Sequence, residues 1–197
     1  VNFNFLLDLV ALGTIANVVK LDDNNRLLVH LGLQRMRAGY ASNGVKALFD
    51  IAGRDIEDAN SEDLGFNIGP RINAAGRLED MTYGIQCLIS VNETYAVNLA
   101  EKLNEYNVKR KEKEKEMKEI ANQILFIEEQ TDNFTKVVYD PSYHEGVVGI
   151  VASRIKEETG CPTIVFTNVE DSDTLIKGSG RSVDCINLKD EIGRAHV

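Results

Sequence analysis

Two segments near the C-terminal end of the chain combine the residue types that bind phosphate. The first, His144–Arg154, predicts the end of a strand, a glycine turn and the start of a helix. The second, Lys177–Ser182, places two glycines beside two serines and two cations. Glycine lets the backbone approach a ligand closely, helix N–H groups attract anions, and arginine makes paired hydrogen bonds to phosphate. Together the segments predict a phosphate-bearing ligand.

Each motif also has a purely structural explanation. His144 either faces a ligand at the strand–helix junction, or caps the helix or lies on the surface. Arg154 either reaches the ligand or is a surface cation. The segment Gly178–Ser182 forms either a phosphate cradle or a hairpin turn. It is not the phosphate loop of the P-loop nucleotidases, because the GK[ST] ending of that loop is missing.

Further candidates lie in the first half of the chain. Arg71 and Arg77 flank a stretch of small residues, and each is either a phosphate ligand or part of an internal salt bridge. Asp8 and Asn17 lie in an apolar segment, where a buried aspartate is costly unless it is paired or binds a metal. Asp8 is therefore either a site residue or a helix cap. The sequence contains no HxDxD, HExxH or Cys/His metal motif, and we interpret His30 as structural.

The composition is that of a folded but acidic protein. The 197 residues carry a formal net charge of −9. This balance argues against a uniformly basic nucleic-acid-binding surface but allows one local basic groove. The three cysteines show no CxxC spacing, which favours reduced thiols in the cytosol. No apolar run reaches the roughly 20 residues of a membrane span.

The first part of the chain is predicted to be helical. Residues 5–19 are apolar nearly all round and predict a buried helix or helix–strand pair. Pro70 is expected to interrupt any regular element. Further helices are predicted over residues 25–38, 44–52, from Ser61 onward, and 80–91.

A long helix and an α/β module follow. Residues 93–130 keep helical spacing, and their charged middle, 109–116, predicts a solvated helix with i,i+4 ion pairs or a nucleic-acid contact. We place a domain boundary within this helix. Strands over residues 136–140, 162–167 and 174–181, with a helix over 146–159, predict an α/β module with a parallel pair.

Four strings in this order resemble one known family. They are DLVALGTIANVVKLDDNNR (8–26), DLGFNIGPRINAAGRLEDM (63–81), HEGVVGIVASRIKE (144–157) and LIKGSGRS (175–182). They resemble the bacterial RecJ single-strand-specific exonucleases of the DHH phosphoesterase superfamily. The resemblance implies an α/β fold, in which the C-terminal part of a DHH domain is joined by a long helix to a partial DHHA1 domain.

The resemblance also implies domain limits. Residues 1–92 correspond to the end of the DHH domain, 93–130 to the connecting helix and 131–190 to a truncated DHHA1 domain. Residues 191–197 do not continue the pattern, and one reading frame of a common sequencing adapter encodes the same seven residues. We interpret them as a non-native tail, and His196 is therefore no site candidate. The chain is expected to be an internal fragment.

Roles for individual residues follow from the same resemblance. Ser179 and Arg181 match the phosphate-contacting pair of the family, and Arg77 matches an arginine of the pocket for the 5′ end. Arg154 and His144 fall in the other DNA-facing motif. Asn17 stands where the family has a metal-binding aspartate. The catalytic residues and the other metal ligands lie outside the chain.

The implied activity is 5′-to-3′ hydrolysis of single-stranded DNA in cytoplasmic recombination and repair. The resemblance implies Mn²⁺ or Mg²⁺ as cofactor, and single-stranded DNA, a single-strand-binding protein and a helicase as partners. Two alternatives stay open. In the first alternative, the chain is a nucleic-acid-binding module without catalysis. In the second, it belongs to the DHH-family oligonucleotide phosphodiesterases. The NAAGR string and the long helix favour the RecJ branch.

Overall fold

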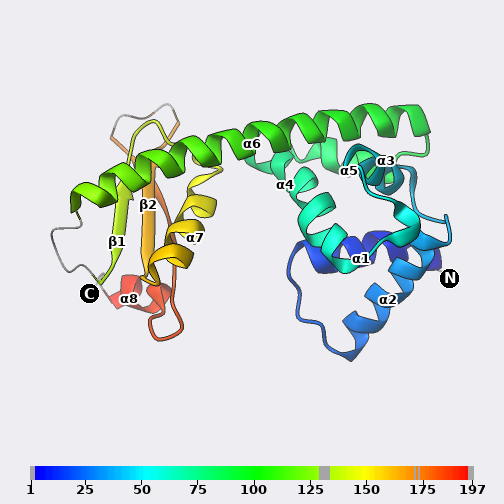
Figure 1. Cartoon of the computed structure of the whole chain (residues 1–197), viewed down its shortest axis with the longest axis horizontal. Coiled ribbons are helices and arrows are strands. Elements are labelled where there is room, and N and C mark those ends of the chain that lie inside the picture. The colour runs from blue at the N-terminus through cyan, green and yellow to red at the C-terminus, as the bar shows by residue number, and fades with distance from the viewer. Residues whose placement is uncertain (1–2, 129–133, 171, 173, 195–197) are drawn as a thin grey trace. The chain divides into compact units, whose positions relative to one another are not determined.

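The chain folds into two compact units. The computed structural model describes residues 3–128, 134–170, 172 and 174–194. The N-terminal unit comprises residues 1–109 and the C-terminal unit residues 110–197. The division falls within the long helix α6, Glu93–Glu128 (Figure 1).

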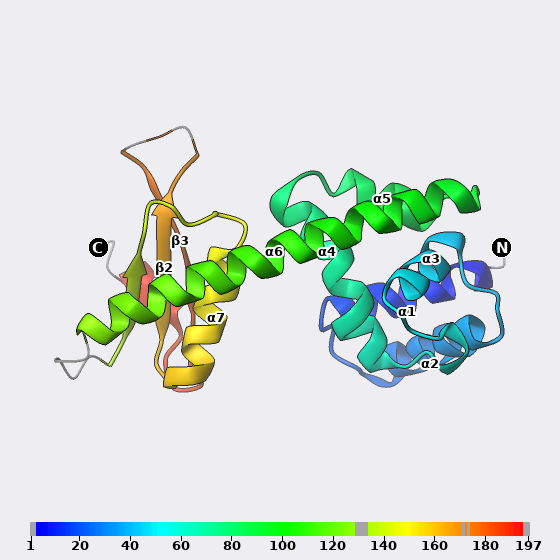
Figure 2. The same ribbon diagram turned by 45° about the horizontal axis from the view of Figure 1, so that its top comes forward.

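The N-terminal unit is helical in its described part (Figure 2). Asp22 caps the start of one of its helices, because its side chain accepts a hydrogen bond from the backbone N–H of Asn25 at 2.9 Å. The predicted helices over 25–38, 44–52 and 80–91 are confirmed, with ends shifted by a few residues. The helices are α1 (Leu7–Ala16), α2 (Asp23–Arg37), α3 (Asn43–Ile51), α4 (Gly69–Leu78), α5 (Thr82–Ile89) and the first part of α6, with short 3₁₀ helices at Asn4–Leu6 and Ile56–Asp58.

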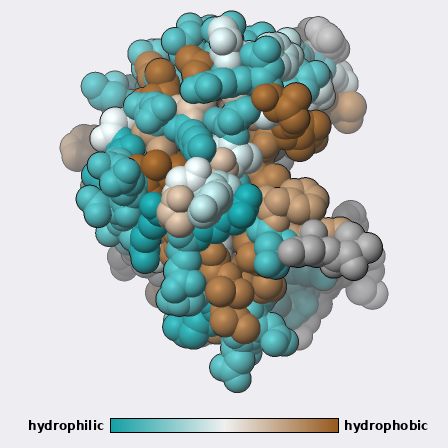
Figure 3. Space-filling view, turned by 90° about the vertical axis from the view of Figure 1, so that its right-hand side faces the viewer, coloured by the Kyte–Doolittle hydropathy of each residue, from teal (hydrophilic) through white to brown (hydrophobic). Residues whose placement is uncertain are grey.

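Residues 5–19 are less buried than predicted. Of this segment only Asp8, Ala11 and Leu12 are buried, whereas Val18 is 90% exposed. The prediction failed because the segments that pack on α1, namely α2, residues 63–68 and α4, cover only part of its surface. Apolar side chains consequently remain on the surface of the protein (Figure 3). A hollow of about 500 Å³ is lined mainly by such side chains, Phe5, Leu6, Leu9, Leu88, Ile89 and Val91.

Pro70 does not interrupt the regular structure, contrary to the prediction. A π-helix over Asp63–Ile68 leads directly into α4, and Pro70 occupies the first turn of α4. A proline is tolerated there because the N–H groups of a first turn have no partner within the helix. The chain therefore continues as one helical segment toward Arg71 and Arg77.

The C-terminal unit is a three-stranded sheet covered by a helix. The strands β1 (Lys136–Tyr139), β2 (Thr163–Asn168) and β3 (Ile176–Arg181) lie in the order β1-β2-β3. Strands β1 and β2 are parallel, which confirms the predicted pair, and β3 is antiparallel to β2. Helix α7 (Val148–Thr159) connects β1 to β2 and packs on β2 and β3 (Figure 2).

The core of this unit is mainly aliphatic and also contains Tyr143 and Met117. Aliphatic side chains come from the middle of the sheet and from the inner face of α7: Val138, Val147, Val151, Ala152, Ile155 and Val165. Helix α8 spans Leu188–Arg194, so the proposed tail begins within it, and residues 195–197 lie outside the described residues.

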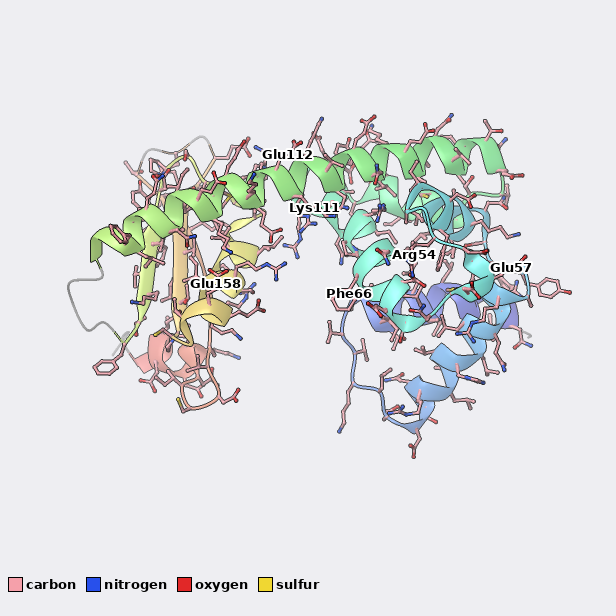
Figure 4. All side chains as sticks on the ribbon, in the orientation of Figure 1. Arg54, Glu57, Phe66, Lys111, Glu112 and Glu158 are labelled. Atoms are coloured by element: carbon pink, nitrogen blue, oxygen red, sulfur yellow. The ribbon has the colours of Figure 1, made fainter. Side chains whose placement is uncertain are left out.

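The second part of α6 is more than a solvated charged helix. Arg110 and Glu114 form an i,i+4 pair at 2.9 Å, with side chains only 12% and 14% exposed. Lys118 of α6 pairs with Glu158 of α7, which is labelled in Figure 4. Met117 and Ala121 are buried. Ion pairs and apolar contacts together thus fix the second part of α6 within the C-terminal unit.

None of the helices in the described part of the chain has an apolar stretch that would let it cross a bilayer.

The burial pattern of α7 predicts the effect of two matched substitutions. Ile155→Ala should destabilise the protein by about 2–5 kcal/mol, because Ile155 is 1% exposed and its truncation leaves a cavity. Ile176→Ala, at a position 59% exposed, should change stability by less than about 0.5 kcal/mol. Urea unfolding measures both, and equal effects would contradict the described packing of α7.

Candidate nucleic-acid interface

The predicted serine–arginine pair faces helix α7. Ser179 and Arg181 are two residues apart on β3, so both side chains project from the same face of the strand. Both are half-buried, whereas Gly178 and Gly180 between and beside them are exposed. The structure therefore brings the two sequence motifs together, the second as the end of a strand and the first as the helix packed on it.

The Arg181 guanidinium is held by oxygen atoms that carry no formal charge. Its Nε donates to Ser153 Oγ at 2.8 Å. Its Nη1 donates to Ser179 Oγ at 2.9 Å and to the carbonyl oxygen of Gly180 at 2.8 Å. Within the described part of the chain, no carboxylate pairs with Arg181. The guanidinium is thus oriented without losing its net charge to a counter-ion.

Two residues of α7 that the sequence analysis did not single out complete this arrangement. Ser153 Oγ accepts from Arg181 and donates to the carbonyl oxygen of Gly149 at 3.0 Å. A methyl group at Gly149 would lie 2.8 Å from Arg181 Nη2 and 3.0 Å from Ser179 Oγ. The i,i+4 spacing of Gly149 and Ser153 in the predicted helix was the available signal, since it places both on one helical face.

Arg154 is engaged differently. Its Nε contacts Glu114 Oε1 at 3.1 Å and its Nη1 contacts Glu157 Oε2 at 3.4 Å. The hydrogen bond from Arg154 to Glu114 is the main reason why the pKa of Arg154 is raised. Both carboxylates offset the charge of Arg154. Because Glu114 lies on α6, its pair with Arg154 joins α7 to α6. The proposed contact of Arg154 with DNA would have to compete with Glu114.

His144 closes the turn that leads into α7. Its Nδ1 accepts a hydrogen bond from the backbone N–H of Gly146 at 3.1 Å. Partial burial, followed by the charge of Lys113, lowers the pKa of His144, although Glu145 and Glu170 act in the opposite direction. The neutral imidazole is therefore favoured near pH 7.

A small cavity of about 270 Å³ adjoins this turn. Its lining combines His144 with the polar groups of Lys113, Ser142, Glu145, Asn168 and Glu170. Glu145 also pairs with Lys177 of β3 at 3.1 Å, so the beginning of β3 is tied to the same turn. The two sequence motifs consequently meet at both ends of β3.

The two other arginine candidates belong to the N-terminal unit. Arg71 has a structural role: its Nε donates to Asn104 of α6 at 3.0 Å and its Nη1 to the carbonyl oxygen of Asn67 at 2.5 Å. Burial lowers its pKa. Arg77 is exposed in the last turn of α4. Its place in the pocket for a 5′ end stays a prediction.

The described residues do not form a metal centre. Asp8 is fully buried, and its Oδ2 accepts from the backbone N–H of Ser42 at 2.7 Å, so it caps the start of helix α3. Asn17 donates from its side chain to the carbonyl oxygen of Gly13 at 2.9 Å, at the end of α1. Three or more His, Cys, Asp or Glu side chains do not gather anywhere in the described part. His30 is exposed on α2, so it is not a core residue.

The class of protein follows from the C-terminal unit. Residues 130–197 match the family model described as the DHHA1 domain. The chain therefore carries a DHHA1 domain, here seen as the three-stranded sheet with α7.

Comparison over the whole chain defines the family. The single-stranded-DNA-specific exonuclease RecJ of Haemophilus influenzae is 45% identical over 99% of this chain and 34% of its own length. The crystal structure of RecJ from Thermus thermophilus with Mg²⁺ matches with a TM-score of 0.81 and 33% identity, over 98% of this chain and 29% of that chain. Its complex with Mn²⁺ matches with a TM-score of 0.73 and 34% identity, over 84% of this chain and 24% of that chain. The chain belongs to the RecJ family and spans about a third of the length of the curated relative named here.

The ion pairs of Glu114 predict a specific loss of stability. Glu114→Gln should cost about 1–3 kcal/mol, because it removes a largely buried carboxylate that pairs with both Arg110 and Arg154. Glu119→Gln is the control, since Glu119 is 64% exposed and lies 4.0 Å from Lys115. It should cost less than about 0.5 kcal/mol. Urea unfolding of both variants checks this, and equal losses would contradict the role given to Glu114.

The turn at His144 predicts a pH dependence. Protonation of Nδ1 removes the acceptor for the Gly146 N–H, and the folded-state pKa is lowered. The contribution of His144 to stability is therefore complete above the ordinary histidine pKa of about 6.5 and is lost as the pH falls below it. His144→Asn keeps an acceptor that does not titrate and should flatten the dependence, whereas His30→Asn should not. Thermal unfolding between about pH 5 and pH 8 measures it, and a profile unchanged by His144→Asn would refute the assignment.

Proposed function

We propose that the chain is the DNA-binding part of a single-stranded-DNA-specific exonuclease of the RecJ type. The observation that carries the proposal is the Arg181 guanidinium, which is fixed by hydroxyl and carbonyl oxygens and has no carboxylate partner among the described residues. The resemblance to relatives named as exonucleases supports the substrate class. The substrate is then a phosphodiester backbone without a complementary strand, degraded from its 5′ end in the cytoplasm.

The donors that remain determine how a phosphate would bind. Arg181 uses Nε and Nη1 within the protein, and no hydrogen bond of Nη2 is found among the described residues. Ser179 Oγ accepts from Arg181, which leaves its own hydroxyl proton for a ligand. We infer that the two N–H groups of Nη2 and the hydroxyl of Ser179 contact one phosphate. Hydrogen bonds of this kind from a charged donor are short and strong.

His144, Arg154 and Arg77 complete the proposed binding residues. His144 would offer its remaining ring nitrogen, Nε2, because Nδ1 is used within the turn. Arg154 would bind only with partial release from Glu114. Arg77 would receive the 5′ end. A single-strand-binding protein and a helicase are proposed as partners of the whole protein.

Hydrolysis is proposed for the whole protein and not for these residues. Mg²⁺ or Mn²⁺ is the proposed cofactor, in keeping with the two RecJ complexes reported above. The described residues supply no cluster of ligands for it. An amide at position 17 is also a weaker ligand for these cations than a carboxylate. This favours a second candidate for the 197 residues alone, namely binding of single-stranded DNA without cleavage.

Removal of the central cation tests the proposed site. Arg181→Ala should weaken binding of an oligothymidylate by about 1.5–3 kcal/mol, because one phosphate contact is lost. For the same reason, the slope of the logarithm of the binding constant against the logarithm of the salt concentration should fall by about one. Arg26→Ala, which removes an exposed arginine of α2, is the control and should change affinity little. Fluorescence anisotropy across a salt titration measures both. Equal affinities of wild type and Arg181→Ala would contradict the proposal.

The metal requirement gives a separate prediction. The 197-residue chain with Mn²⁺ should bind 5′-phosphorylated single-stranded DNA but release no nucleotides, because the described residues form no metal centre. Gel analysis of a labelled strand measures cleavage. The opposite result would be a nuclease activity that co-purifies with the chain and that EDTA abolishes. Such an activity would show that the chain holds a working metal site.

A further inference from the structure

The surface of α7 beneath Arg181 has a gap at one position. Gly149 is the second residue of α7, and the Arg181 guanidinium lies where its side chain would be. A Cβ atom there would come within 2.8 Å of Arg181 Nη2, a distance at which one of the two groups must move. The guanidinium is the far end of a flexible side chain, so it would be the group displaced.

Ser153 holds the guanidinium in this gap from the next turn of the helix. Its hydroxyl proton goes to the carbonyl oxygen of Gly149 and its lone pair receives Arg181 Nε–H. Its donor is thereby used within the helix, which leaves no proton for a ligand. Ser179 differs, since only its acceptor is used. The two serines thus have different roles: Ser153 orients the arginine, and Ser179 has a proton to offer a phosphate.

We propose that Gly149 and Ser153 are positioning residues for phosphate binding, which form a seat that fixes the Arg181 guanidinium against α7 with Nη2 beside Gly149. Gly149 provides the space and Ser153 the hydrogen bond. The seat explains how a half-buried arginine keeps one orientation without a carboxylate partner among the described residues. The inference rests on the proposed function, because the ligand of the seated guanidinium is the phosphate of a single strand.

A substitution that strengthens the helix should therefore weaken binding. Gly149→Ala should leave the unfolding temperature unchanged or raise it, because alanine favours the helix over glycine. The same variant should bind an oligothymidylate about tenfold more weakly, because its methyl group displaces the guanidinium. Gly13→Ala in α1 is the matched control, since a methyl group there meets nothing within 4 Å. Gly13→Ala should change the unfolding temperature as Gly149→Ala does, and should leave the affinity for the oligothymidylate unchanged.

A double-variant cycle separates the seat from other causes. If Gly149 acts through Arg181, the double variant Gly149→Ala/Arg181→Ala should bind no more weakly than Arg181→Ala alone. Ser153→Ala should weaken binding by a smaller factor, and Ser153→Thr, which keeps the hydroxyl, should restore it. The NMR signal of the Arg181 Nε–H should shift in Gly149→Ala and Ser153→Ala but not in Ser153→Thr.

The outcomes distinguish this inference from the proposed function. If Arg181→Ala weakens binding but Gly149→Ala binds as wild type, the positioning role of Gly149 and Ser153 is wrong and the proposed function stands. The same conclusion follows if the effects of Gly149→Ala and Arg181→Ala on the binding free energy simply add. If wild type and Arg181→Ala bind equally, or neither binds, the proposed function fails and the seat fails with it.

Discussion

The proposed phosphate site of the C-terminal unit depends on the contact between the end of β3 and the first turns of α7. At this contact Arg181 is held by two serine hydroxyls and a backbone carbonyl oxygen, over a helix position that has no side chain. A carboxylate in the same place would orient the guanidinium equally well but would cancel the charge that a phosphate needs. Neutral acceptors satisfy the half-buried donors and leave the charge available.

Three other cations of this unit show the contrast. Arg154, Lys118 and Lys177 each pair with a glutamate, and these pairs hold α6, α7 and β3 together. A chain with a net charge of −9 can therefore still present a half-buried arginine with which no carboxylate among the described residues pairs. The repulsion of DNA by the remaining negative charge is screened beyond about 8 Å at physiological salt. Local arrangement, rather than net charge, decides whether a phosphate can bind here.

Periodicity and turn residues were enough to predict most helices, the strands and the parallel pair. The failures arose where tertiary contacts decide. The apolar run of residues 5–19 was expected to be buried all round, but its neighbours cover only part of α1. Pro70 was expected to interrupt any regular element, yet it fits the first turn of α4. The motif around Arg181 was recognised from its residue types, whereas Gly149 gained meaning only once β3 was known to lie against α7.

A crystal structure of the chain with a short oligothymidylate would show directly whether Arg181 binds phosphate from its place on α7. We expect one phosphate within hydrogen-bond distance of both Arg181 Nη2 and Ser179 Oγ, with the hydrogen bond from Arg181 Nε to Ser153 Oγ intact. A strand bound with its phosphates away from Arg181, or an Arg181 side chain that has left α7 to reach the DNA, would contradict this expectation.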